Sequence, residues 1–209
     1  MMAYAFLTWI VLLMLLRVIA YETVQDAAII SRHMVEHSIN SIGTMATVYP
    51  SDHPTMAGQP FGLQEYYASC FSNGSLTLLV LPISRHSQNI LHSPVHSASI
   101  TISSQHPAAS HSRVSLLGNV TVYQDWDNVF EEEAIKACYL GRHPDASRWL
   151  PNDEDAAHIA YWARFDPHSI YFVGGFGDEH YIGYIPLEIY QNASAARGVA
   201  GRVLIEQHA

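Results

Sequence analysis

The 209-residue sequence predicts an α+β domain, mainly of antiparallel strands, in which a β-barrel is flanked by peripheral helices. Two observations lead to this fold class. Short apolar segments bounded by turn residues recur along the chain, and two helical patterns stand out among them. Strands and helices do not alternate regularly, which argues against a parallel doubly wound sheet. With no internal repeat in sight, we expect a single domain over residues 21–209.

Two main helices and a short helical link are predicted. The first helix begins after Thr23, a good N-cap, and carries an apolar stripe at helical spacing. The stripe consists of Val24, Ala27, Ile30 and Met34. The second helix begins after Asn128, has Glu131, Glu132 and Glu133 in its first turn, and ends at Gly141 and Pro144. The short link is expected over residues 85–92.

Strands are expected where apolar and aromatic residues run between turn signals; eight such segments occur, and they predict about seven strands. The segments are residues 41–49, 61–71, 76–83, 95–103, 114–123, 158–165, 170–176 and 181–185. Glycines at 174, 175 and 177 lie between a strand and a hairpin, so they indicate a tight turn. They lack the spacing and the following helix of a dinucleotide-binding motif.

The charge balance excludes one class of partner. Ten Lys and Arg against 19 Asp and Glu give a net charge of −9, and no basic cluster is present. A nucleic-acid surface needs massed cations, so we expect no nucleic-acid partner. The 13 histidines are spread along the chain, so its net charge rises on acidification.

The N-terminus predicts entry into the secretory pathway. Residues 6–16 form an apolar run of signal-peptide length, too short to span a bilayer, and Val18 and Ala20 are the small residues that cleavage requires. We therefore predict a signal peptide over residues 1–20 and a mature chain that starts near Tyr21, with no stable membrane span after cleavage. A retained anchor is the alternative, because Arg17 closes the apolar run. The expected location is extracellular or endolysosomal.

Three glycosylation sequons agree with this location: Asn73-Gly-Ser, Asn119-Val-Thr and Asn192-Ala-Ser. Asn73 and Asn192 lie among turn residues, whereas Asn119 falls within an expected strand, where a glycan fits only on a solvent-facing side. Cys70 and Cys138 can form a disulfide in an oxidising lumen, or remain two small buried apolar residues. Both alternatives are open from the sequence.

One metal motif occurs by pattern. Residues 33–37 read His-Met-Val-Glu-His, which matches the inverted zinc-peptidase pattern. The helix is short, follows the leader directly, and places both histidines beside its apolar stripe. We therefore expect His33 and His37 to cover the edge of the core, and we predict no metal site.

Several segments together resemble a known family. Residues 81–94, followed by a strand, resemble the strand–helix–strand unit of the flavin-binding split barrels typified by pyridoxamine 5'-phosphate oxidase. Arg142-His-Pro-Asp145, the strand around Tyr161-Trp-Ala163, and Phe176-Gly177 followed by residues 186–190 resemble the CREG family of secreted glycoproteins. The likeness covers residues 23–192. It implies an FMN-binding split-barrel type of fold with six strands, and a homodimer.

The resemblance also implies where FMN would bind. In flavin-binding relatives the link after the central strand holds the FMN phosphate, and the matching positions are Ser84, Arg85, His86, Ser87, Gln88 and Asn89. Ser87 can supply a hydroxyl, but Gln88 stands where a basic residue is expected, and Arg85 is three positions early. Charge-assisted hydrogen bonds are about twice as strong as neutral ones. We therefore expect a vestigial site that does not hold FMN tightly.

Local chemistry identifies no catalytic residue: the sequence has no G-x-S-x-G elbow, no P-loop and no recognisable carboxylate pair. The resemblance favours a secreted or endolysosomal CREG-like glycoprotein that is not catalytic and acts by binding a protein or receptor. The alternative is an FMN-dependent oxidoreductase of the pyridoxamine 5'-phosphate oxidase-like type, with FMN as the sole candidate cofactor.

Overall fold

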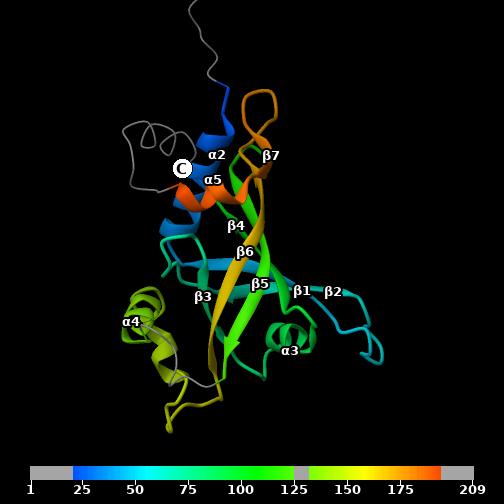
Figure 1. The fold of residues 1–209 in the computed structure, drawn as a ribbon, viewed down its shortest axis with the longest axis vertical. Coiled ribbons are helices and arrows are strands. Elements are labelled where there is room, and N and C mark those ends of the chain that lie inside the picture. Colours follow the sequence, from blue (N-terminus) through cyan, green and yellow to red (C-terminus); the bar gives the residue numbers. More distant parts are fainter. Residues whose placement is uncertain (1–20, 125–131, 194–209) are drawn as a thin grey trace, which may run out of the picture.

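A computed structural model of the chain describes residues 21–124 and 132–193 as a seven-stranded antiparallel sheet with helices packed around it (Figure 1). The strands are β1 Ile42–Val48, β2 Pro60–Tyr66, β3 Leu76–Val80, β4 Ser97–Ser103, β5 Arg113–Tyr123, β6 Tyr161–Val173 and β7 Ile182–Ile185. The helices are α2 Val24–His37, α3 Arg85–His92, α4 Glu132–Arg142, the 3-10 helix η2 Pro144–Arg148 and α5 Leu187–Asn192. The predicted fold class is confirmed.

The sheet curls into a barrel that stays open on one side. The strand order is β2-β1-β4-β5-β6-β3, and β7 pairs with β6 off this path. Within the described residues no ladder joins the end strands β2 and β3. An isolated bridge between Ala68 and Thr77 draws the segment after β2 toward β3. The six-stranded path with this split is the arrangement that the resemblance implied.

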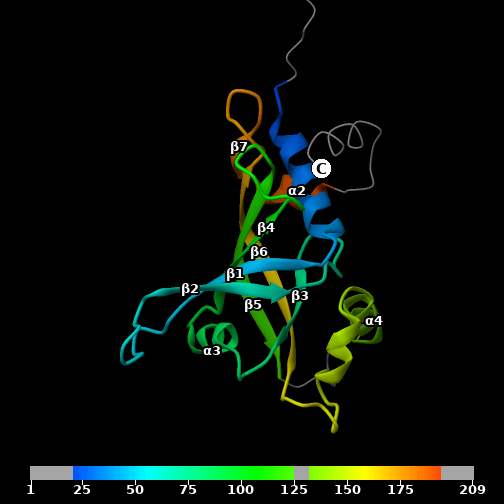
Figure 2. The ribbon, with the colours of Figure 1, turned by 180° about the vertical axis from the view of Figure 1, so that it is seen from behind.

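The interior holds two apolar clusters. The larger fills the barrel and includes Met45, Ile100, Leu116 and Phe172, with residues of α2 and α5 packed onto it. Figure 2 shows α2 near the β6–β7 hairpin and α4 at the opposite end of the molecule. The smaller cluster joins α4 and the segment after η2 to β3 and β6. Its members include Leu79, Ile135, Tyr139, Leu150 and Trp162. β3 is buried at every position, and four of its five residues are apolar, Thr77 being the exception.

Local signals correctly located the start of α2 and the whole of α3. Thr23 Oγ1 accepts a hydrogen bond from the backbone N–H of Asp26 at 3.2 Å, and Asp26 Oδ2 accepts from the N–H of Thr23 at 3.0 Å. This reciprocal pair is a capping box, which satisfies two amides at the helix start. α3 spans the predicted residues 85–92.

The prediction of two strands over 158–165 and 170–176 was wrong: β6 is one strand of 13 residues. Residues 166–169 lie between the two predicted segments, but the β5–β6 ladder continues across them by a register shift between Leu117 and Gly118. Gly118 pairs with Pro167, and a Cβ on Gly118 would lie 2.3 Å from the Asp166 carbonyl oxygen. A glycine opposite the proline therefore lets the strand bend without breaking.

Three element ends also differ from prediction. β2 stops at Tyr66 rather than residue 71, because the chain turns there so that Ala68 can bridge to β3. β3 stops at Val80, after which the chain turns into α3. α4 continues through Gly141 to Arg142, and Pro144 begins η2. The expected cap Asn128, Glu131 and the predicted signal peptide lie outside the described residues. No helix in the described ranges is long and apolar enough to cross a bilayer.

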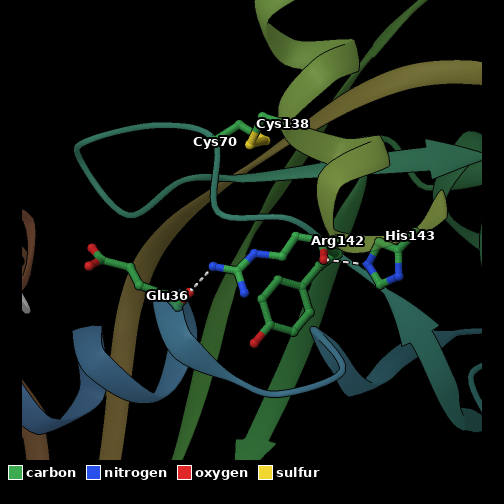
Figure 3. The surroundings of a disulfide bond; sticks show 6 residues. Glu36, Cys70, Cys138, Arg142 and His143 are labelled. Carbon is green, nitrogen blue, oxygen red and sulfur yellow. Dashed lines mark hydrogen bonds between the residues drawn. A yellow bond between two sulfur atoms is a disulfide. The ribbon is translucent and has the colours of Figure 1, made fainter.

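The two cysteines, Cys70 and Cys138, form a disulfide between α4 and the segment after β2 (Figure 3). Beyond it, Arg142 Nη2 donates to the Glu36 carbonyl oxygen of α2 at 2.8 Å. His143 Nε2 donates to the Tyr67 carbonyl oxygen at 2.8 Å, and its ring stacks on that of Tyr66 with centroids 4.2 Å apart. α4 is thus fixed to the barrel by one covalent bond and by hydrogen bonds at its C-terminal end.

Candidate functional site

The link implied by the resemblance is the first turn of α3, which follows β3. Ser84 is the N-cap: its hydroxyl oxygen accepts from the backbone N–H of Ser87 at 3.2 Å and its O–H donates to Ser87 Oγ at 2.8 Å. Ser87 is buried, with 3% of its surface exposed. The hydroxyl that was expected to meet a phosphate is therefore part of the cap.

The basic residues of the link point into the protein or onto a neighbouring ring. The Arg85 guanidinium lies 5.1 Å from the centre of the Tyr49 ring, a cation–π contact. His86 is buried; its Nε2 donates to the Leu63 carbonyl oxygen at 3.3 Å, which leaves Nδ1 to accept from the Thr47 hydroxyl at 3.2 Å. Burial lowers the pKa of His86, so its ring stays neutral near pH 7.

The remaining two residues of the link are also engaged within the fold. Gln88 Nε2 donates to the Pro82 carbonyl oxygen at 3.1 Å. Asn89 Nδ2 donates to Thr47 Oγ1 at 3.0 Å, and Thr47 in turn donates to His86, so the three side chains form one chain of hydrogen bonds. Asn89 Oδ1 is buried without a hydrogen-bond partner. Each of the six residues thus serves the structure of α3 or its contact with a neighbouring strand.

A cleft of about 280 Å³ adjoins this turn and occupies the split between β2 and β3. Gln64, Glu65 and Tyr66 line it from β2, and Leu79 and Leu81 line it from β3 and its end. Ser84, Tyr139 and Trp149 complete its wall. This wall, formed within the described residues, contains no lysine or arginine.

Glu65 is the ionisable residue of this cleft that the sequence did not single out. Its side chain lies on the same side of β2 as Phe61 and Leu63, and it is half-buried. Burial raises the pKa of Glu65 to about 6, although the N–H of Tyr66 donates to its carboxylate at 3.2 Å. The signal that could have revealed it is strand alternation, which places this acid on the face of Phe61 and Leu63.

A larger cleft, of about 520 Å³, lies beside α2 and is lined by His33, His37, Asn40 and Gln105, among others. The two imidazole rings are 4.8 Å apart. Glu36 pairs instead with Arg32, so it is not held as a base between them. Within the described residues no third His, Cys, Asp or Glu joins the pair in a metal-like cluster.

The three sequons lie in different surroundings. Asn119 is on the outward face of β5 and exposed, and Asn192 is exposed at the end of α5. Asn73 is half-buried; its Oδ1 accepts from the N–H of Ser75 at 3.2 Å. Space around the acceptor therefore favours Asn119 and Asn192, whereas the turn residues in the sequence had favoured Asn73 and Asn192.

Comparison with known proteins gives a family match over most of the chain. The family model described as "CREG, beta-barrel" matches residues 22–192. Among curated protein sequences, none matches the chain significantly.

The solved structures similar to this chain include two heme proteins and, at lower structural similarity, an FMN-binding protein. A heme-binding protein from Mycobacterium smegmatis has 21% identity and a TM-score of 0.61; 84% of this chain aligns, covering 63% of that protein, which is under two thirds of its length. HutZ, a heme storage protein from Vibrio cholerae, has 18% identity and a TM-score of 0.50, with 68% and 92% of the two chains covered. A pyridoxamine 5'-phosphate oxidase-related FMN-binding protein from Nostoc punctiforme has 14% identity and a TM-score of 0.45, with 68% and 80% covered.

Proposed function

The chain belongs to the CREG beta-barrel family, and from this premise we propose that it is a secreted or endolysosomal glycoprotein that acts by binding and is not catalytic. The observation that carries the proposal is the state of residues 84–89. Ser84 and Ser87 cap α3, Gln88 holds a backbone carbonyl and His86 is buried and neutral near pH 7. A phosphate entering here would have to break these contacts.

Electrostatics beside the link favour the same conclusion. The adjoining cleft offers the Glu65 carboxylate and no Lys or Arg among its described lining residues. FMN phosphate carries nearly two negative charges, so a carboxylate in the same cleft repels it. Arg85 is the arginine of the link itself, but its guanidinium lies over the Tyr49 ring, and Arg85 is not among the residues that line the cleft.

The alternative function is an FMN-dependent oxidoreductase, and a titration separates the two. We would follow FMN fluorescence on addition of the protein, using the unmodified chain and the variant Gln88→Arg, which restores the missing cation. The proposal expects weak binding by the unmodified chain and tighter binding by the variant, by about tenfold or more for one charge-assisted contact. The control Gln191→Arg adds the same charge at the end of α5, outside the link. Submicromolar binding of FMN by the unmodified chain would overturn the non-catalytic function.

A homodimer is part of the proposal, and the outward face of the sheet supports it. At the centre of this face, neighbouring strands place Thr44, Ser99, Thr101, Ser115 and Leu117 side by side. Tyr171 and Tyr184 extend it across β6 and β7, where both are exposed. None of these residues is charged, and the two exposed tyrosines add aromatic area, both of which are expected of the centre of an interface.

The proposed entry into the secretory pathway has support near the start of the domain. The Tyr21 hydroxyl donates to the Gly177 carbonyl oxygen, and the buried Glu22 carboxylate accepts from the N–H of Tyr181 at 3.0 Å. A mature chain that begins near Tyr21 would keep both contacts. The Cys70–Cys138 disulfide fits an oxidising compartment.

A further inference from the structure

The cleft between β2 and β3 has a chemistry that neither the family match nor the flavin comparison addresses. It is lined by the apolar side chains Leu79 and Leu81 and by the aromatic side chains Tyr66, Tyr139 and Trp149. A carboxylate, Glu65, is the acidic group that lines it. Apolar and aromatic walls around one charged group are typical of small-molecule sites.

Among the described residues, no cation pairs with the Glu65 carboxylate. Its hydrogen-bond partner in the described part of the chain is the N–H of Tyr66, a neutral group. The ion pairs found among the described residues are Arg32–Glu36, Arg164–Asp166 and His180–Glu22, and none includes Glu65. A desolvated carboxylate without a counter-ion is unfavourable, so the cleft favours a ligand that brings positive charge.

Neighbouring groups add to the negative potential. Tyr66 donates its hydroxyl proton to Asp145 at 3.1 Å, so a second carboxylate lies beside the aromatic wall. The pKa of Tyr139 is raised by burial first, and the negative charges of Glu65 and Asp145 raise it further. The His143 ring stacks on that of Tyr66, and its centroid lies 5.0 Å from the centroid of the Tyr139 ring. His143 Nε2 donates to the Tyr67 carbonyl oxygen.

We propose that this cleft is a binding site for a small organic cation, a primary or quaternary ammonium ion, with Glu65 as its counter-ion and Trp149, Tyr66 and Tyr139 as its aromatic wall. Ammonium ions are attracted to the faces of such rings, most strongly to Trp. The volume of about 280 Å³ suits a ligand the size of choline rather than a nucleotide. The inference goes beyond the proposed function and is tested with a different ligand, so either can fail alone.

The test uses choline and its neutral isostere 3,3-dimethyl-1-butanol, which has the same shape without the charge. Both are titrated into the full mature protein at pH 7.5 by isothermal titration calorimetry. Saturable choline binding at or below about 1 mM, with the isostere at least about tenfold weaker, is the expected result. Equal binding of the two ligands, or no choline binding, would overturn the proposal.

Two variants assign the residues. Glu65→Gln keeps the shape and removes the charge, and is expected to weaken choline about tenfold or more while leaving the isostere unchanged. Trp149→Leu is expected to lower the ratio of choline affinity to isostere affinity about threefold or more. Loss of packing alone would weaken both ligands equally, because they have the same shape, and would leave this ratio unchanged. The matched control Glu179→Gln removes an exposed carboxylate at the β6–β7 hairpin and should change neither affinity. Unchanged choline binding by Glu65→Gln would overturn the assignment.

The pH dependence separates Glu65 from its neighbours. Choline does not titrate, so protonation of Glu65 between pH 7.5 and pH 5 should weaken its binding about tenfold, given a carboxyl pKa of about 6. In Glu65→Gln this dependence should vanish. A dependence that persisted in the variant would assign it to His143 or Asp145 and contradict the role given to Glu65.

Discussion

Arg32 of α2 and Tyr190 of α5 meet inside the fold, with the guanidinium carbon 5.4 Å from the centre of the phenol ring and Nη1 3.2 Å from the Tyr190 carbonyl oxygen. Arg32 also donates to the carbonyl oxygens of Ser72 and Gln191, at 2.8 and 3.1 Å, and pairs with Glu36. Only 2% of its surface is exposed. One buried cation therefore joins α2, α5 and the turn before β3.

Replacing Arg32 by Lys should destabilise the protein strongly. A lysine keeps the charge but cannot direct donors to three carbonyls and a carboxylate at once, so some buried acceptors are left unpaired. We expect the free energy of unfolding in urea to fall by about 2–4 kcal/mol. Arg142→Lys, which affects an exposed arginine with one hydrogen bond to the Glu36 carbonyl, should cost about 1 kcal/mol or less. Equal effects of the two variants would contradict this role of Arg32.

Glu65 should make stability depend on pH. Burial raises the pKa of Glu65 from 4.5 to about 6 in the folded state, so folding favours the protonated acid. Stability from this group is then fully present below pH 4.5 and is lost as the pH rises through 6, by at most about 2 kcal/mol. Glu65→Gln should match the parent at pH 4.5 and exceed it by about 1–2 kcal/mol at pH 7.5.

Chemical denaturation without ligand at the two pH values measures this difference. The variant Glu179→Gln, at an exposed position, is the control and should follow the parent at both. If the free energy of unfolding of Glu65→Gln differed from that of the parent by the same amount at both pH values, the cleft would not desolvate the carboxylate.

The disulfide should contribute to the stability of the α4 end. It closes a loop of 68 residues, so replacing both Cys70 and Cys138 by Ser should lower the free energy of unfolding by about 2–4 kcal/mol. Because Tyr139 lies on α4 next to Cys138 and lines the Glu65 cleft, its amide should also exchange hydrogen faster. Thermal unfolding and hydrogen exchange check both points, with the amides of β5 as the internal reference. Full protection of α4 in the double variant would contradict the prediction.

A charge at the centre of the outward face should break the proposed dimer. Ser99 lies between Ala46 on β1 and Leu117 on β5, so Ser99→Arg would bury an unpaired cation in the interface. Sedimentation at micromolar concentration should report a monomer for this variant and a dimer for Ser147→Arg, which changes an exposed serine of η2. A monomeric parent protein would remove the basis of the prediction.

The product from the native host should start near Tyr21 and carry glycans. Asn119 and Asn192 are exposed, so glycans there extend into solvent. Asn119 pairs with Ser97 of β4, and the ladder between β1 and β4 does not reach Ser97. A glycan on Asn119 is therefore attached away from the centre of the sheet face and leaves that centre open. Intact mass before and after glycosidase, with Asn119→Gln and Asn192→Gln for assignment, tests this. An unprocessed Met1 and no loss of mass would be the contrary result.

Much of the local structure could be predicted because its causes are local. Thr23 and Asp26 form a capping box within four residues, and the apolar run that becomes β3 marks a strand buried on both faces whatever lies around it. The family likeness was visible in the order of short segments. The link at 84–89 was located from the family resemblance, and in the structure Ser84 caps the helix that begins there.

The tertiary structure decided what depends on distant residues. Because Pro167 pairs with Gly118, the two predicted strands form the single strand β6. Because α4 packs close to the segment after β2, Cys70 and Cys138 form a disulfide. Glu65 became a candidate ligand-binding group because β3, α4 and the segment after η2 surround it, and none of the described residues that line the cleft is a lysine or arginine. Desolvation and pairing depend on contacts between residues far apart in the chain, and the periodicity of one segment carries no information about them.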